Sequence, residues 1–214
     1  MVRCFYALRP DSLNWPTRPD GAPSFKLEDL TAANGLEHGA AHDAMSDVTA
    51  TLALARALRS ADRALFEVLL SMRFKARVEA LVDTNAMTPL VYVSGLMGTE
   101  CACLGVIAPL SVHPDYKSDI ICADLTREPD FLSMTPEEIQ ARLFAKGDEL
   151  TSPGDRPGLM TIKVNKAPVL LPMQHISPDI AARLGLDGDR LRRNLATLRR
   201  AREDRGSEFI QHLQ

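Results

Sequence analysis

The sequence predicts an α+β fold with a helical first part and a β-rich second part. Residues 44–58 and 62–82 carry apolar side chains at the three-to-four spacing of packed helices. The segments 89–95, 104–114 and 118–125 are instead short, rich in β-branched residues and bounded by Gly or Pro, as strands are. With 214 residues, 45% of them hydrophobic, the chain can bury the core of one large domain or two small ones.

The helical part begins unusually, because the short segment 3–8 runs into a Pro-rich loop that extends to Pro23. Residues 23–35 then predict a short helix that starts at the N-cap Ser24 and ends at Asn34-Gly35. Asp43 can cap the next helix, and residues 62–82 predict a continuing helix. The apolar stripe expected to pack this second helix consists of Ala44, Val48, Leu52, Ala55 and Leu58.

The β-rich part predicts a small antiparallel barrel or sheet. Residues 134–147 predict a helix with Thr135 as N-cap, Pro136 at its first position and Glu138 completing a capping box. After a Gly/Pro loop at 152–158, residues 159–172 predict one further strand, on which Lys163 and Asn165 alternate with apolar neighbours. Terminal helices are expected over 177–187 and 189–206.

Composition restricts the function only weakly. The formal charge of −3 provides no global electrostatic case for nucleic acid binding, although the segment from Arg183 to Arg205 has a local excess of four positive charges. That segment can equally be a solvated helix face laced with ion pairs. The chain has neither a run of about 18 apolar residues nor the apolar centre of a signal peptide, so we expect a cytoplasmic protein without a membrane anchor.

The cysteines and the single tryptophan have structural interpretations. Cys4, Cys101, Cys103 and Cys122 are expected to stay thiols in a reducing compartment. Three of them could join His113 in a zinc set, but small buried thiols in strands explain them better than this irregular spacing does. Trp15 is expected to pack its loop onto the core, with stacking on a DNA base as the alternative.

His42 and Asp47 are the candidate catalytic pair. They stand five residues apart where a loop becomes a helix, and the spacing alone is also compatible with a loop histidine beside a charged helix start. However, Asp47 lies next to the apolar stripe, so its carboxylate is anchored on a rigid element. Such a carboxylate suits Mg²⁺, and a histidine on the preceding loop can take a proton from water. Together they would form half of a metal-assisted phosphodiester hydrolysis site.

At these residues the sequence becomes recognisable. "PSFKLEDLTAANGLEH" followed by "AHDAMSDVTATLALARAL" resembles the end of the nuclease domain in the bacterial exodeoxyribonuclease I family, which is a group of DEDDh exonucleases. "YALRPDSLNWP", "MTPLVYVSG", "APLSVHP", "IKVNKAPVL" and "ARLGLD" also resemble that family, so the resemblance covers nearly the whole chain. It implies the C-terminal part of a ribonuclease-H-like exonuclease domain at 1–58, followed at 59–214 by an SH3-like β-barrel domain with flanking helices.

The resemblance also implies a reaction and partners. The family degrades single-stranded DNA from 3′ to 5′ to 5′-mononucleotides with two Mg²⁺ ions, in DNA repair and recombination. His42 matches the histidine that deprotonates the attacking water, and Asp47 matches the last of four metal-binding carboxylates. The single-stranded-DNA-binding protein is the implied protein partner, and the complete enzyme is expected to be a monomer. Phosphate contacts are expected from the basic residues Arg73, Lys75, Arg77, Lys163 and Lys166, for which ordinary surface charge is the alternative.

The family's other three carboxylates belong upstream of Met1, and its helical domain belongs after Gln214. We therefore expect an internal portion of such an enzyme with little or no nuclease activity, in which an apolar helix face of the first 60 residues is exposed and promotes association. The alternative function is a non-catalytic SH3-like module that binds single-stranded DNA or a protein.

Overall fold

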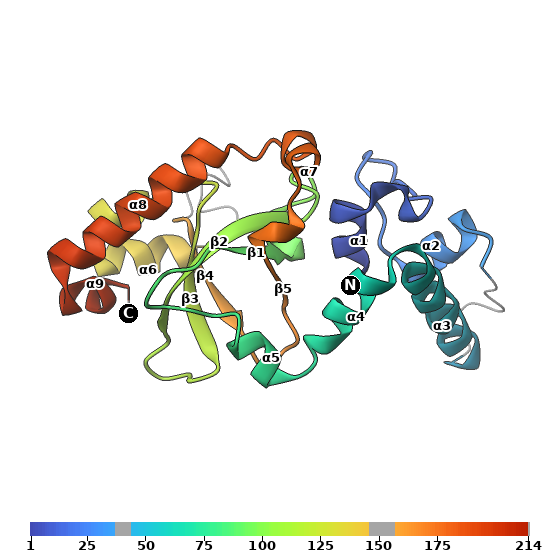
Figure 1. The fold of residues 1–214 in the computed structure, drawn as a ribbon, viewed down its shortest axis with the longest axis horizontal. Coiled ribbons are helices and arrows are strands. Elements are labelled where there is room, and N and C mark those ends of the chain that lie inside the picture. The colour runs from blue at the N-terminus through green and yellow to red at the C-terminus, as the bar shows by residue number, and fades with distance from the viewer. Residues whose placement is uncertain (37–43, 146–156, 214) are drawn as a thin grey trace. The chain divides into compact units, whose positions relative to one another are not determined.

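The computed structural model describes residues 1–36, 44–145 and 157–213 (Figure 1). These residues divide into two compact units. The first comprises Met1–Arg73 with Val93–Leu104, and the second comprises Phe74–Tyr92 with Gly105–Gln214. No described helix has both the length and the apolar character needed to cross a membrane.

The first unit is helical. Its elements are α1 (Val2–Leu8), η1 (Pro10–Ser12), α2 (Leu27–Ala33), α3 (Ala44–Ala61), α4 (Arg63–Ser71) and η2 (Gly95–Met97). Although α1 is short, Phe5 is fully buried and Leu8 almost so, and Leu30 of α2 and Leu58 of α3 also belong to the core. The opening segment, which the sequence left unassigned, is therefore a core helix.

The N-cap of α2 lies two residues later than expected. Lys26 is its N-cap residue and provides no side-chain cap, while the Ser24 hydroxyl donates to the Asp29 carboxylate. The prediction of Ser24 as N-cap was thus wrong, because its short side chain is used to tie the preceding loop to the helix. The expected end is confirmed, since Asn34 is the C-cap residue and Gly35 adopts the left-handed φ of +61°.

The α3 helix exists as predicted, but its buried face differs from the expected stripe. Ala50, Leu54 and Leu58 are buried, whereas Val48 and Leu52 are 54% and 49% exposed. The helix packs against α2 and α4, and only the face that carries the buried residues is covered. Apolar spacing alone could not reveal this, because α3 carries small or apolar side chains on more than one face.

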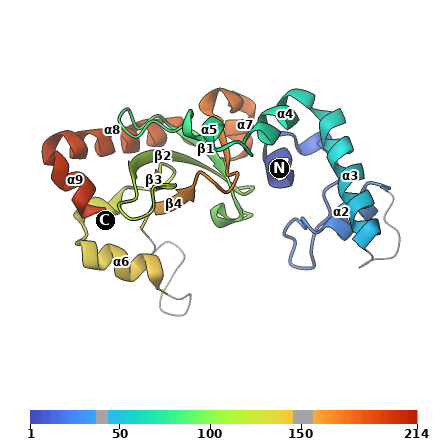
Figure 2. The same cartoon turned by 90° about the horizontal axis from the view of Figure 1, so that it is seen from below.

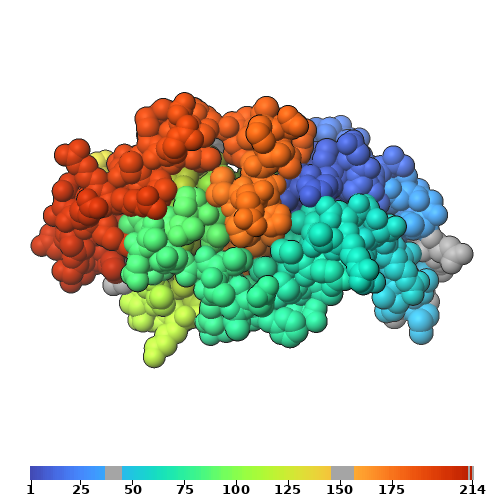
Figure 3. Space-filling view, in the orientation of Figure 1, coloured from blue at the N-terminus to red at the C-terminus, as the bar shows by residue number. Residues whose placement is uncertain are grey.

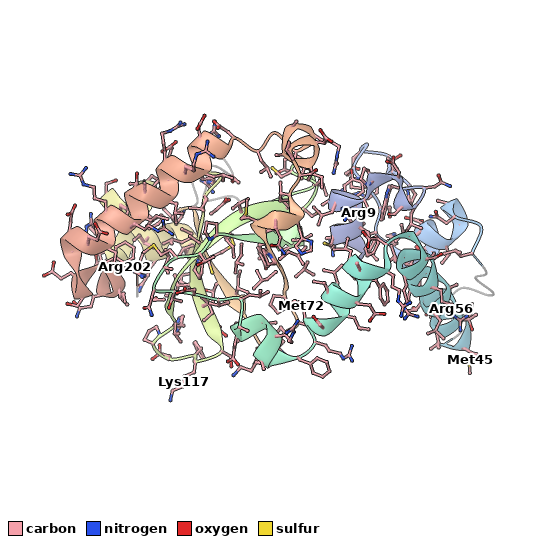
Figure 4. The ribbon with its side chains drawn as sticks, in the orientation of Figure 1. Arg9, Met45, Arg56, Met72, Lys117 and Arg202 are labelled. Atoms are coloured by element: carbon pink, nitrogen blue, oxygen red, sulfur yellow. The ribbon has the colours of Figure 1, made fainter. Side chains whose placement is uncertain are left out.

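The predicted continuous helix over 62–82 is interrupted. Residues 72–74 separate α4 from α5 (Lys75–Glu79). The Asp62 carboxylate caps α4 by accepting from the Leu65 amide at 2.9 Å, and it pairs with the Arg9 guanidinium at 2.8 Å. Figure 4 shows Arg9 at the end of α1, so this carboxylate fixes the start of α4 relative to α1.

The second unit contains most of a five-stranded sheet and its flanking helices. Its further elements are β1 (Leu90–Val93), β2 (Leu104–Val112), β3 (Asp119–Asp124), η3 (Asp130–Ser133), α6 (Pro136–Phe144), β4 (Leu159–Lys163), β5 (Val169–Pro172), η5 (Met173–His175), α7 (Pro178–Arg183), α8 (Gly188–Arg205) and α9 (Ser207–His212). The predicted capping box of α6 is confirmed, with both Thr135–Glu138 hydrogen bonds present. The α9 helix was not anticipated, and it follows Gly206 with a φ of +56°.

The sheet is open, in the order β4-β3-β2-β1-β5, and does not form the closed barrel that was one of the two expectations. The β2–β3 and β3–β4 pairs are antiparallel, and the β2–β3 register shifts between Pro109 and Ser111. Residues 159–172, predicted as one strand, form two strands at opposite edges of the sheet. The turn between them contains Ala167 at a positive φ of 47°, and it is followed by Pro168, which has no amide to donate.

One face of this sheet carries the core of the second unit. Val106, Ala108 and Leu110 alternate along β2 into a cluster that also contains Phe131 and Leu198. Figure 2 shows α6, α8 and α9 at the same end of this unit. Asn194 of α8 is buried there, and its side-chain amide donates to two backbone carbonyls after β3, those of Leu125 and Arg127. These bonds fix α8 to the chain that leaves the sheet.

Candidate functional site

Asp47 lies in the first turn of α3, and its side chain is exposed. At helical spacing it extends the line of Ala50, Leu54 and Leu58, whose burial anchors the helix. The helix N-terminus favours a negative charge at this position. Asp47 is thus an accessible carboxylate in the first turn of a helix, as the sequence predicted, but it aligns with Ala50, Leu54 and Leu58 and not with the expected stripe. Its role as a metal ligand stays a prediction.

His42 and Asp43 lie outside the described residues, so their predicted roles stay predictions. The same limit applies to the loop at 152–158, of which only the last two residues are described. Within the described ranges no group of three or more His, Cys, Asp or Glu side chains could hold a metal ion. Asp47 alone suits Mg²⁺ as one ligand among several, so the described residues do not form a complete Mg²⁺ site.

The basic candidates are all exposed but differ in their neighbours. The Lys163 ammonium pairs with Asp119 at 2.7 Å, and Lys75 pairs with Glu79 at 3.1 Å. Neither Arg77 nor Lys166 has a carboxylate within 4 Å among the described residues. Arg73 belongs to the first unit, while the other four belong to the second. Arg77 and Lys166 are therefore the candidates with charge most available to a phosphate.

Trp15 packs within the first unit, as predicted. Its indole N–H donates to the Pro10 carbonyl at 2.7 Å, and its ring meets Tyr6 of α1 edge to face with centroids 5.3 Å apart. Phe25 completes this aromatic cluster, with its centroid 5.4 Å from that of Tyr6. A ring held in this way is partly buried and orders the Pro-rich loop.

The arginines of α8 combine surface ion pairs with structural contacts. Arg192 pairs with Asp189 at 2.5 Å, in line with the expected ion-paired face. Arg202, in contrast, donates to the carbonyls of Thr84 and Leu110, and burial lowers its pKa. Arg202 is labelled on α8 in Figure 4, and Figure 3 shows α8 and α9 in red at the surface. Arg202, one of the positive charges in the segment 183–205, therefore stabilises the second unit.

The cysteines follow the expected pattern only in part. Cys122 is fully buried in β3, and burial raises the pKa of its thiol. Cys101, however, is exposed and lies in the turn before β2, so the expectation of buried strand thiols was wrong there. Cys101 and Cys103 belong to the first unit, whereas His113 and Cys122 belong to the second.

One feature of the first unit has no counterpart among the sequence candidates. It is a hollow of about 350 Å³, called here the basic hollow, whose cationic lining residues are Arg3, Arg18 and Lys26. These residues come from α1, from the Pro-rich loop and from the residue before α2. No local motif connects them, so only the folded chain brings them together.

The five-stranded open sheet, with antiparallel β2–β3 and β3–β4 pairs, and the helices of both units define an α+β protein. A family model described as "Exonuclease I SH3-like domain" matches residues 73–213.

Two relatives extend the match beyond that domain. The chain is 42% identical over 201 residues to an exodeoxyribonuclease I of Haemophilus influenzae, covering 93% of this chain and 42% of the relative. It is 38% identical over 200 residues to an exodeoxyribonuclease I of Escherichia coli, covering 93% and 42%. The chain therefore belongs to the exonuclease I family, and it spans about two fifths of the length of these relatives.

Solved structures agree with this assignment. E. coli Exonuclease I in complex with a dT13 oligonucleotide matches with a TM-score of 0.89 and 36% identity, over 99% of this chain and 45% of that one. A zinc-ion-bound form of an E. coli ExoI–ssDNA complex matches with a TM-score of 0.89 and 35% identity, over 100% and 45%. An ExoI/SSB-Ct complex matches with a TM-score of 0.88 and 35% identity, over the same shares.

Proposed function

We propose that this chain is part of a DNA exonuclease that degrades single-stranded DNA from 3′ to 5′ and releases 5′-mononucleotides, in DNA repair and recombination. The observation that carries the proposal is the family membership over 93% of the chain, together with an accessible Asp47 on a helix anchored by its buried face. The oligonucleotide bound to the E. coli structure supports single-stranded DNA as the substrate class. Because its substrate would be bacterial DNA, we place the protein in the cytoplasm.

Two parts share the work in this proposal. Residues 1–58 contribute the last part of the nuclease domain, and residues 59–214 form the SH3-like part with its flanking helices. His42 would take a proton from the attacking water, and Asp47 would hold Mg²⁺ with further ligands outside the described residues. When bound, Mg²⁺ would supply positive charge that offsets the negative charge developing during phosphodiester hydrolysis. Arg73, Lys75, Arg77, Lys163 and Lys166 hold backbone phosphates, and the single-stranded-DNA-binding protein is the proposed partner, supported by the ExoI/SSB-Ct complex.

The 214-residue chain alone should bind single-stranded DNA and release few or no mononucleotides, because one carboxylate holds Mg²⁺ only weakly. The test is release of nucleotides from a 3′-labelled oligonucleotide with Mg²⁺. It compares the chain with His42→Ala, Asp47→Asn and the control Glu67→Gln, which changes an exposed carboxylate of the same unit. Robust release that survives both site variants would refute the assigned roles of His42 and Asp47.

A second experiment tests the enzyme as a whole. The chain is fused behind the portion of the H. influenzae relative that precedes the matched region. Nucleotide release should appear in this fusion, and Asp47→Asn should abolish it while Glu67→Gln leaves it intact. A fusion that binds DNA without cleaving it would instead favour the alternative function, a non-catalytic SH3-like binding module. That alternative is supported by the second unit, which has a core of its own and accounts for most of the SH3-like match.

A further inference from the structure

The basic hollow lies entirely within the first unit. Its lining residues are Arg3, Arg18, Pro23, Ser24, Phe25, Lys26, Gly95, Thr99 and Cys103. Three of these side chains are cations and none is a carboxylate. A concave surface of this kind, with positive charge contributed by three separate segments, is complementary to an anion.

Arg3 is held in place by groups that leave its charge unneutralised. Its guanidinium carbon lies 5.1 Å from the centroid of the Phe25 ring. Its positive charge also opposes the burial that raises the pKa of the Cys103 thiol, another lining residue of the hollow. No described carboxylate lies within 4 Å of it. An arginine positioned by stacking presents its remaining N–H groups in a fixed fork, which matches the oxygens of a phosphate.

Arg18 and Lys26 are neutralised only loosely. Arg18 pairs with Asp20 at 3.1 Å and Lys26 with Glu28 at 3.8 Å, and all four side chains are about half exposed or more. Exposed ion pairs contribute little free energy and are screened by salt. Both cations can therefore turn to a stronger anion that enters the hollow.

We propose that the basic hollow binds a backbone phosphate of single-stranded DNA, at a position separate from the Asp47 carboxylate. This inference rests on the proposed function, because it takes DNA as the ligand. The hollow is less suited to an acidic peptide. Its large apolar lining residues are Pro23 and Phe25, and the Arg3 guanidinium covers a face of the Phe25 ring, which leaves little apolar surface for a peptide side chain.

Trp15 offers a readout close to the hollow. It is the only tryptophan of the chain, and its ring centroid lies 6.5 Å from that of Phe25. The chain is titrated with oligo-dT, and Trp15 emission and the anisotropy of a labelled oligonucleotide are measured together. Thymidine monophosphate, inorganic phosphate and an oligoglutamate peptide are titrated separately to distinguish the sources of the anion.

The variants are Arg3→Gln, Arg18→Gln and Lys26→Gln. The control is Arg56→Gln, which removes one exposed charge from α3, a helix that does not line the hollow. Each variant of the hollow should weaken oligo-dT binding about three- to tenfold. The slope of log affinity against log salt should fall by about 0.7 for each phosphate that the variant no longer neutralises. Arg3→Lys should restore part of the affinity, since it keeps the charge but lacks the planar fork.

The outcomes separate this inference from the proposed function. If the wild-type chain binds oligo-dT and the variants of the hollow behave like Arg56→Gln, the inference is wrong and the proposed function stands. If the wild-type chain does not bind oligo-dT, both fail. If Trp15 emission responds to oligoglutamate or to thymidine monophosphate at a lower concentration than it responds to oligo-dT, DNA is not the ligand of the basic hollow. Arg18 and Lys26 lie in exposed positions, so their variants stay informative even if Arg3→Gln fails to fold.

Discussion

Replacing Asp62 by alanine should destabilise the first unit, because this carboxylate has two partners. It caps α4 through the Leu65 amide, and it pairs with Arg9 at the end of α1. Loss of an N-cap costs about 1 kcal/mol, and a partly exposed ion pair contributes about 0.5 kcal/mol. The free energy of unfolding should thus fall by about 1.5 kcal/mol. Asp62→Asn should cost only about 0.5 kcal/mol, since asparagine caps as well but carries no charge.

Urea unfolding followed by Trp15 fluorescence measures this effect, since Trp15 packs against Tyr6 of α1 and reports on the first unit. With a slope of about 1.5 kcal/mol per molar urea, Asp62→Ala should lower the midpoint by about 1 M and Asp62→Asn by about 0.3 M. Arg9→Gln should resemble Asp62→Asn, because it removes the ion pair and leaves the cap. Equal midpoints for Asp62→Ala and Asp62→Asn would refute the capping argument.

The same carboxylate predicts a pH dependence. The hydrogen bond from the Leu65 amide, and then the Arg9 guanidinium, lower the pKa of Asp62 below its ordinary value. A carboxyl group whose pKa is lower in the folded state contributes stability that is complete above the unfolded pKa of about 4 and is lost as pH falls through the folded pKa. The difference between the wild-type chain and Asp62→Ala should therefore be constant from pH 6 to 8 and shrink below about pH 4. A difference that grows on acidification would contradict this sign.

Three further predictions concern other parts of the molecule. Asn194→Ala should lower the free energy of unfolding, measured by far-UV circular dichroism, by about 1–3 kcal/mol, because a buried carbonyl and a partly buried one lose their donor. The exposed Asn165→Ala should have no effect, and equal costs for the two variants would refute this. A thiol reagent at pH 8 should label one cysteine, Cys101, in the native chain and four in denaturant, since the other three are buried; fast labelling of a second native thiol would contradict the structure. The exposed apolar side chains on α3 should promote self-association of the wild-type chain. The double variant Val48→Glu with Leu52→Glu should then be a monomer by light scattering. A wild-type chain that is already monomeric would contradict this prediction.

Local features of the sequence determined much of the fold. The capping box at Thr135 and Glu138, the helix end at Gly35 and the three β-rich segments after Thr88 all appear where they were predicted. Each depends on residues that are neighbours in the chain, and a short-range hydrogen bond or a backbone preference decides it. The family was also recognisable, because its residues keep their order and spacing along the chain.

Other features depended on contacts that sequence spacing does not encode. The face of α3 that is buried, the break between α4 and α5, and the placement of β4 and β5 at opposite edges were each predicted wrongly. In every case the apolar pattern was compatible with more than one arrangement, and packing against distant elements selected one of them.

The same distinction applies to the functional residues, since some could be predicted from the sequence and others only from the structure. Asp47 could be proposed from the sequence alone, because helical periodicity and a recognisable motif mark it within a few residues, and its role as a metal ligand stays a prediction. The basic hollow could be found only in the structure. Its three cations are separated by up to 23 positions in the chain and belong to segments with no common pattern, and the aromatic packing of Phe25 with Tyr6 and Trp15 brings them around one concave surface. Sequence determines chemistry that acts over one or two helical turns, whereas sites assembled from distant segments exist only once tertiary packing is complete.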